Sequence, residues 1–216
     1  MSVLPDAEAV ARTAADAVAD AIARGSRTLV LAGGSTPRRC YELLAERDIV
    51  WGRVTVLFGD ERCVPPFDAE SNYRMAKETL LERVAPASVH RMPGELGPDA
   101  AADEYERVVA SVGSLDLVLL GIGADGHTAS LFPGSDTLRS ERLVVGVRDA
   151  PKPPHERVTL TLRALNSASR VLILAAGEDK ADAVARAADR QVPAGMVEHA
   201  EWVVDRAAAG AAATAP

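Results

Sequence analysis

The segment GIGADGH at residues 121–127 carries two titratable side chains, Asp125 and His127, among glycines. An ordinary histidine has a pKa of about 6.5, so it is largely neutral at pH 7 and can take a proton from water and later return it. We predict His127 as a general base and Asp125 as a group that orients its ring or binds a substrate hydroxyl. The alternative is a helix-capping Asp125 beside a surface His127, but the flanking glycines indicate close approach by another molecule.

A glycine turn at residues 33–37, GGSTP, could hold a phosphate through Gly34, Ser35 and Thr36. A turn that leads from a strand into a helix offers free backbone N–H groups, the positive end of the helix dipole and, here, two hydroxyls. The sequence has neither the GK[ST] of a Walker A loop nor a GxGxxG, so it gives poor support for a nucleotide. An ordinary helix capped by Ser35 or Thr36 is the open alternative.

Arg62 ends the motif GDER at residues 59–62, which follows an apolar run. A guanidinium there could bind an anionic substrate through two parallel hydrogen bonds. The alternative is a local ion pair with Asp60 or Glu61 that stiffens the loop. Asn72, further along the chain, is equally suited to join this group and to cap the helix expected from Tyr73.

A second set of basic side chains, Lys152, His155 and Arg157, lies in a proline-rich segment, and Lys180 stands at the start of an expected helix. Cations near strand ends would create the local positive field that a phosphorylated substrate requires. A lysine in the first turn of a helix opposes the helix dipole, so a ligand would help to explain Lys180. The alternative is a solvated surface lysine.

Short apolar runs, separated by segments with helical periodicity, must position these side chains. We expect strands at residues 28–32, 53–58, 89–92, 115–120, 143–147, 158–162, 171–175 and 201–204. We expect helices at residues 1–23, 37–44, 73–84, 98–112, 163–169 and 179–188, and a loop at 59–72. This alternation predicts a mostly parallel, layered α/β fold whose strands hold the ligand at their carboxyl ends. We expect one catalytic domain over residues 1–206 and a frayed, alanine-rich tail over 207–216.

Composition and charge restrict the class of partner. The 216 residues are 48% hydrophobic and carry a formal net charge of -7. Since no run of Lys or Arg contradicts that average, we expect no nucleic-acid partner. Charged residues among the first 23 argue against a signal peptide or a membrane span, so we expect no membrane partner.

The cysteines and the remaining histidines indicate structural roles. The two cysteines, Cys40 and Cys63, are too few for a disulfide framework, which fits a reducing cytoplasm. His90, His155 and His199 have no carboxylate partner at the spacing of metal ligands. We therefore expect no metal site.

Several motifs together resemble one known family over nearly the whole chain. In order they are GGSTP, FGDER with a downstream SNY, LGIGADGHTASLFPG, ERVTLT and AAGEDK, and they resemble the 6-phosphogluconolactonase family of the pentose phosphate pathway. DGHTASLFPG is the most specific, because GGSTP is shared with relatives such as glucosamine-6-phosphate deaminase. The deaminases typically read like HIAFNEPG after DGH, whereas Ser130-Leu131-Phe132 stands here in place of the Asn-Glu pair. The segment VPAGM at 192–196 departs from the family's Pro-Ala-Ser segment.

The resemblance implies a three-layer Rossmann-like fold of the deaminase, ribose-5-phosphate isomerase and CoA-transferase type, with no metal and no cofactor. It implies His127 as the catalytic base, with Asp125 as its companion. The implied contacts to the substrate's phosphate and other polar groups are Gly34, Ser35, Thr36, Arg62, Arg157 and Lys180. The implied reaction is hydrolysis of 6-phospho-D-glucono-1,5-lactone to 6-phosphogluconate in the cytoplasm, and functional coupling to glucose-6-phosphate dehydrogenase is a further expectation.

Two rival functions stay open. A sugar-phosphate isomerase or deaminase on the same scaffold would use His127 in ring opening. A sugar-phosphate sensor would bind its ligand without turnover, and such a protein more often carries a DNA-binding segment, for which this chain offers neither length nor charge.

Overall fold

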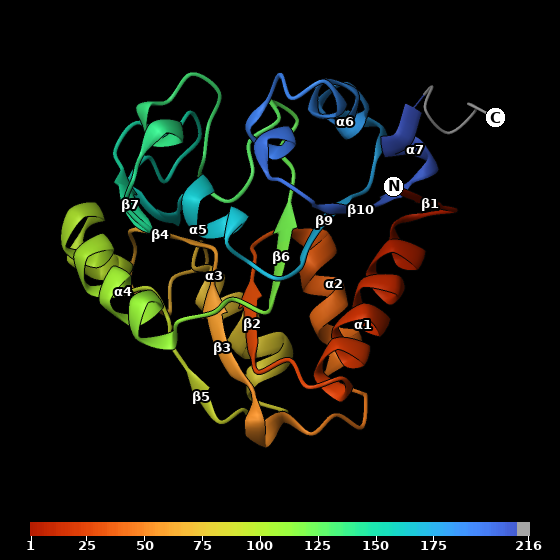
Figure 1. The fold of residues 1–216 in the computed structure, drawn as a ribbon, viewed down its shortest axis with the longest axis horizontal. Coiled ribbons are helices and arrows are strands. Elements are labelled where there is room, and N and C mark those ends of the chain that lie inside the picture. The colour runs from red at the N-terminus through yellow and green to blue at the C-terminus, as the bar shows by residue number, and fades with distance from the viewer. Residues whose placement is uncertain (211–216) are drawn as a thin grey trace.

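The computed structural model describes residues 1–210, and a parallel sheet of seven strands forms its centre (Figure 1). The strands follow the spatial order β1-β10-β9-β6-β2-β3-β5. Their bounds are β1 (Ser2–Leu4), β2 (Thr28–Leu31), β3 (Thr55–Phe58), β5 (Ser88–Val89), β6 (Leu117–Gly121), β9 (Val171–Ala175) and β10 (Glu201–Asp205). Every residue of β2 and β9 is buried, as expected for central strands covered on both faces. The expected α/β fold with a mostly parallel sheet is confirmed.

The helices form where apolar residues recur at helical spacing. Their bounds are α1 (Ala7–Ala23), α2 (Ser35–Leu44), α3 (Asn72–Ala76), α4 (Pro98–Val112), α5 (Leu162–Asn166), α6 (Ala181–Ala188) and α7 (Arg206–Ala209). Helix α3 continues into a π-helical turn, Lys77–Leu81. In α1 the residues Val10, Ala14 and Val18 share one buried face. Helices α1 and α2 lie against each other and both contact β9 (Figure 1).

A second sheet of three antiparallel strands packs beside the first. It consists of β4 (Asp60–Arg62), β8 (Arg157–Leu160) and β7 (Val144–Val147), in the order β4-β8-β7. Helix α4 contacts both β7 and β8. The loop expected at 59–72 is therefore wrong in its first part, because Asp60, Glu61 and Arg62 pair with β8.

Both ends of the chain also differ from expectation. The helix expected from residue 1 begins at Ala7, where the Asp6 side chain accepts a hydrogen bond from the Ala9 N–H at 2.8 Å, and residues 2–4 pair with β10 instead. The first residues of the expected frayed tail belong to α7, in which Ala208 and Ala209 are buried. Residues 211–216 of that tail lie outside the described part of the chain.

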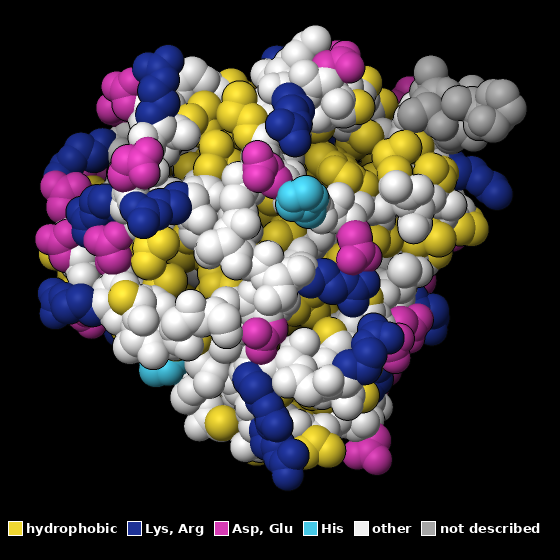
Figure 2. Space-filling model, viewed as in Figure 1, with side chains coloured by type: hydrophobic (Ala, Val, Ile, Leu, Met, Phe, Trp, Pro, Cys, Tyr) yellow, Lys and Arg dark blue, Asp and Glu magenta, His cyan; other side chains and the backbone are white. Residues whose placement is uncertain are grey.

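The surface mixes charges of both signs. Figure 2 shows Lys and Arg side chains interspersed with Asp and Glu over the viewed face. None of the helices in the described part of the chain is both long enough and apolar enough to span a membrane.

Candidate active site

A cleft of about 250 Å³ opens at the carboxyl ends of three neighbouring strands, β2, β6 and β9. The chain runs outward from β2 to β3 and β5 on one side, and returns to β6, β9 and β10 on the other. Ligands bind at such a reversal of strand order in open α/β sheets. The lining includes Gly33, Gly34, Ser35, Thr36, Asp60, Arg62, Asn72, His127, Lys152, Arg157 and Lys180. All the predicted site residues except Asp125 thus line one cleft, and Asp125 contacts it through His127.

Asp125 holds the imidazole of His127 by its Nδ1 atom. The Asp125 Oδ1 atom lies 2.5 Å from His127 Nδ1 and 3.2 Å from the His127 backbone nitrogen. Burial would raise the pKa of the Asp125 carboxyl, but the adjacent His127 outweighs burial through charge and hydrogen bonds and lowers that pKa. An ionised Asp125 can only accept a hydrogen bond, so we assign the ring proton of His127 to Nδ1. This leaves Nε2 as the basic nitrogen. This arrangement suits a general base.

Glycines let the loop around His127 fold tightly. A side chain at Gly123 would place its Cβ 2.1 Å from the Cε1 and Nδ1 atoms of His127, so the imidazole lies directly over that backbone. Gly126 has a φ of +87°, a conformation that favours glycine, and the Val192 side chain packs against it. The Ala194 N–H donates to the Gly126 carbonyl at 3.1 Å. The segment at 192–196, which departs from the family pattern, therefore supports the loop that carries His127.

Two arginines face each other across the small sheet at the cleft. Arg62 of β4 and Arg157 of β8 are directly paired residues. Arg157 donates from Nε to the Pro154 carbonyl and from Nη2 to the Lys152 carbonyl, both at 3.0 Å. Burial lowers the pKa of the Arg157 guanidinium. Like charges opposite each other destabilise a sheet, so this pair is typical of a site that binds an anion.

The local ion pair considered for Arg62 does not form. Its Nη1 atom donates instead to the Glu70 carbonyl at 2.6 Å and to Asn72 Oδ1 at 2.9 Å. Glu61 accepts hydrogen bonds from the backbone of Arg62, Asn72 and Tyr73 and from the Ser71 hydroxyl. Burial raises the pKa of the Glu61 carboxyl, and these four donors oppose that shift. Glu61 thus stabilises the loop through four hydrogen bonds. The Arg62 guanidinium forms no ion pair with a carboxylate in residues 1–210.

Asn72 is a site residue that sequence reasoning did not identify. The helix cap is Ser71, whose hydroxyl accepts from the Arg74 N–H, so the capping role considered for Asn72 is wrong. The Asn72 side chain is buried, accepts from Arg62 and donates to the Asp60 carbonyl at 2.9 Å. It also fills the space that a side chain at Gly33 would need. The sequence signal for Asn72 was its place in the SNY motif downstream of GDER.

The glycine turn has a different cap from the one expected. Gly34, with a φ of +107°, is the N-cap of α2, and no side chain caps the helix. Ser35 and Thr36 therefore lie in the first turn, where backbone N–H groups have no partner within the helix. Both residues line the cleft, which is where the prediction of a phosphate contact needs them.

The remaining basic residues divide between the cleft and the surface. Lys180 lines the cleft, and its Nζ atom lies 2.8 Å from Asp179 Oδ2. It ends a short 3₁₀ turn, Glu178–Lys180, just before α6. Lys152 also lines the cleft, whereas the His155 ring is exposed and lies against the Ala150 carbonyl. Lys152 brings further positive charge to the cleft, whereas the charge of Lys180 is paired with that of Asp179.

Neither cysteine has the character of a nucleophile. Burial raises the pKa of both Cys40 and Cys63 to about 12, so each thiol is protonated at neutral pH. Among residues 1–210, no group of three or more His, Cys, Asp or Glu side chains is arranged to hold a metal ion.

Known proteins resemble this chain over most of its length. The model of the family described as Glucosamine-6-phosphate isomerases/6-phosphogluconolactonase matches residues 5–205. A 6-phosphogluconolactonase of Streptomyces coelicolor is 40% identical over an alignment that covers 94% of this chain and 89% of that protein.

Solved structures of two activities share the fold. The crystal structure of a 6-phosphogluconolactonase from Thermotoga maritima superposes with a TM-score of 0.87 at 32% identity, and covers 95% of this chain and 98% of that one. A monomeric glucosamine-6-phosphate deaminase superposes with a TM-score of 0.82 at 26% identity, and covers 97% and 99% respectively. The resemblance found in the sequence motifs is therefore confirmed, and the chain belongs to the glucosamine-6-phosphate isomerase/6-phosphogluconolactonase family.

Proposed function

We propose that this protein hydrolyses 6-phospho-D-glucono-1,5-lactone to 6-phosphogluconate, as a lactone hydrolase. The observation that carries the proposal is the placement of two arginines that form no ion pair within residues 1–210, Arg62 and Arg157, in the same cleft as the His127–Asp125 pair. The cations suit a phosphorylated substrate, and the imidazole suits activation of water. The names of relatives such as the S. coelicolor protein support the choice of a lactone.

The reaction uses His127 twice. Nε2 takes a proton from a water molecule while the water oxygen attacks the lactone carbonyl carbon. A cation such as Arg62, or backbone N–H groups of a glycine loop other than the phosphate-binding turn, stabilises the tetrahedral oxyanion. When the bond from the carbonyl carbon to the ring oxygen breaks, protonated His127 returns its proton to that oxygen. Asp125 keeps the ring in the required tautomer and stabilises the imidazolium between the two steps.

The phosphate is held away from the reacting carbon. Arg157, Lys180 and the first-turn N–H groups of Ser35 and Thr36 offer it positive charge and hydrogen-bond donors from three different elements. This phosphate contact supplies binding energy that can orient the lactone over His127.

Turnover of the lactone tests the proposal. We expect the protein to accelerate the loss of 6-phosphogluconolactone generated in situ, after the spontaneous rate is subtracted, and His127→Ala to lower kcat by about a hundred- to ten-thousand-fold. The variant should keep its circular dichroism spectrum and its affinity for 6-phosphogluconate within about threefold, because His127 is not one of the proposed phosphate contacts. Near-normal turnover by His127→Ala would remove His127 from the mechanism.

The deaminase reaction is the second candidate, because a deaminase structure superposes on almost the whole chain. Glucosamine 6-phosphate should be supplied to the same protein in parallel, with ammonia release as the readout. Ammonia release without acceleration of lactone loss would assign the chain to the deaminase activity.

A cytoplasmic location and functional coupling to glucose-6-phosphate dehydrogenase belong to this proposal. Two cysteines that both remain free fit a reducing compartment. A dehydrogenase that oxidises the sugar phosphate would supply the lactone, which makes the coupling chemically consistent.

A further inference from the structure

Phe132 lies beside both the catalytic histidine and an anion-binding arginine. Its ring centroid is 4.8 Å from that of the His127 imidazole, and the two planes are inclined by 43°. The Arg157 Cζ atom lies 5.7 Å from the same Phe132 centroid. One aromatic ring therefore contacts a residue of the proposed proton transfer and a residue of the proposed phosphate site.

The surroundings of Phe132 hold the ring in place. Only 6% of the residue is exposed, and it packs in an apolar cluster with Val147 and Ala150. Its neighbour Ser130 anchors the segment to the small sheet, since the Ser130 hydroxyl donates to Asp60 Oδ2 at 2.6 Å and its N–H donates to the Thr159 hydroxyl at 3.1 Å. A side chain so enclosed cannot move aside when its neighbours shift, so it transmits displacement.

The two neighbours of Phe132 differ in the hydrogen-bonding capacity that they keep free. His127 is fixed by Asp125 on one edge and lies over Gly123. Arg157 donates only to two backbone carbonyls within residues 1–210, and two of its five N–H groups are used in doing so. Arg157 is itself only 6% exposed and its guanidinium already lies over the Phe132 ring, so an anion bound to its remaining N–H groups would hold the guanidinium against that ring without a large movement.

We propose that Phe132 is a positioning residue that couples anion binding at Arg157 to the orientation of the His127 imidazole. The inference rests on the proposed lactone hydrolysis and deepens it. Binding of the substrate's phosphate would hold the guanidinium against the aromatic ring, and the ring would in turn fix the imidazole for attack. Phosphate would then raise kcat as well as affinity, because a remote group of the substrate would contribute to alignment at the reacting centre.

Kinetics with and without the phosphate give the first test. The native protein, Phe132→Leu and the control Phe67→Leu are compared on 6-phosphogluconolactone and on unphosphorylated gluconolactone. Phe67 is 77% exposed, so the control makes the same change at a free surface position. We expect Phe132→Leu to reduce the ratio of the two kcat values about tenfold, mainly through the phosphorylated substrate, and Phe67→Leu to leave the ratio unchanged. An unchanged ratio in Phe132→Leu would overturn the proposal.

A spectroscopic signature separates coupling from a merely structural role. Inorganic phosphate is titrated into the native protein while the imidazole resonances of His127, assigned by comparison with His127→Asn, are followed by NMR. We expect them to move on phosphate addition in the native protein and to stay in place in Phe132→Leu, although calorimetry still detects phosphate binding. Equal movement in both proteins would also overturn the proposal.

A second substitution at Phe132 and the activity of the native protein serve as controls for these tests. If Phe132→Leu fails to fold, Phe132→Met fills similar volume without an aromatic face and carries the same expectations. Failure of the proposed function is distinguishable, because the native protein would then accelerate hydrolysis of neither lactone.

Discussion

Gly123 leaves no room for a side chain, because the His127 imidazole occupies the space where a Cβ would lie. We expect Gly123→Ala to lower kcat on the lactone about a hundredfold, since the methyl group would displace the ring from its hydrogen bond to Asp125. Gly52→Ala is the matched control, because a Cβ at Gly52 meets nothing within 4 Å. Steady-state kinetics and melting temperatures of both variants would check this, and wild-type kcat in Gly123→Ala would show that the ring tolerates displacement.

At this scale the sequence identifies residues whose chemistry is local. Asp125 and His127 are two positions apart, so their hydrogen bond follows from the loop itself. The roles of Asn72 and Phe132 depend on partners far along the chain, Arg62 and Gly33 for the first and Arg157 for the second. No pattern in their own neighbourhood contains that information.

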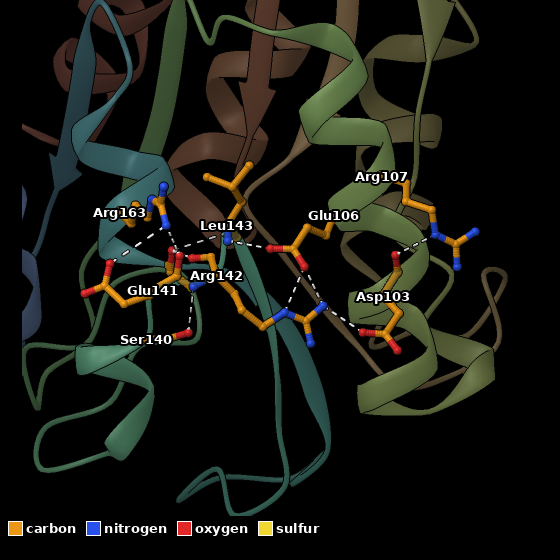
Figure 3. A network of polar contacts seen from close by, with 9 residues as sticks. Asp103, Glu106, Arg107, Ser140, Glu141, Arg142, Leu143 and Arg163 are labelled. Atoms are coloured by element: carbon orange, nitrogen blue, oxygen red, sulfur yellow. Dashed lines mark hydrogen bonds and ion pairs between the residues drawn. The ribbon is translucent and has the colours of Figure 1, made fainter.

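Among the elements, helix α4 is joined by its carboxylates to the residues that lead into strand β7, and Glu106 makes most of these contacts, as Figure 3 shows. Glu106 of α4 accepts from the Leu143 N–H at 2.7 Å, and from Arg142 Nε at 2.8 Å and Nη2 at 2.5 Å. Arg142 also donates to Asp103 of the same helix at 2.7 Å. Burial would raise the pKa of Glu106, but the hydrogen bonds from Arg142 and Leu143 outweigh it and lower that pKa.

We expect Glu106→Gln to lower the free energy of unfolding at pH 7 by about 1 kcal/mol, because a charge-assisted contact is lost while the Leu143 bond can remain. A carboxyl with a lowered folded-state pKa stabilises the fold above its ordinary value of 4.5 and loses that contribution as the pH falls through the lowered value. The difference between variant and native protein should therefore shrink below pH 4.5. Urea unfolding at several pH values would measure it, with Glu104→Gln, an exposed position on the same helix, as control. A difference independent of pH would contradict this account.

Strands whose burial is complete can be predicted from composition, whereas a strand made by pairing alone cannot. The buried β9 was expected at residues 171–175 and lies there. The polar triplet of β4 has no apolar pattern and is a strand only because β8 supplies its partner. The start of α1 was misplaced for a similar reason, since β10 pairs with residues 2–4.

Across the whole molecule, the cleft draws its lining from both sheets. Gly34 and His127 follow strands of the central sheet, and Arg62 and Arg157 belong to the small sheet. A ligand that contacts all of them links two parts of the fold. The sequence predicted the central sheet and its ligand-binding edge, but the separate small sheet arises from long-range pairing that no local pattern specifies.

We expect 6-phosphogluconate at about 100 times its Kd to raise Tm by roughly 5–10 °C, because it binds only the folded protein. Gluconate, which lacks the phosphate, should give a much smaller increase at the same concentration, and Arg157→Leu should remove most of the difference between the two ligands. Differential scanning fluorimetry would measure these shifts. Equal stabilisation by both ligands would show that the phosphate does not reach the arginines.

Strand β1 lies at the edge of the central sheet beside β10, so residues 2–4 pair with residues 203–205 (Figure 1). During synthesis β1 leaves the ribosome about 200 residues before β10, and β1 has no pairing partner in the described sheet until β10 follows. Closing a loop of that length also makes the pairing entropically one of the slowest to form. The nascent chain must therefore carry β1 unpaired until β10 has been made, and completion of this edge of the sheet becomes a late event in the folding of the domain.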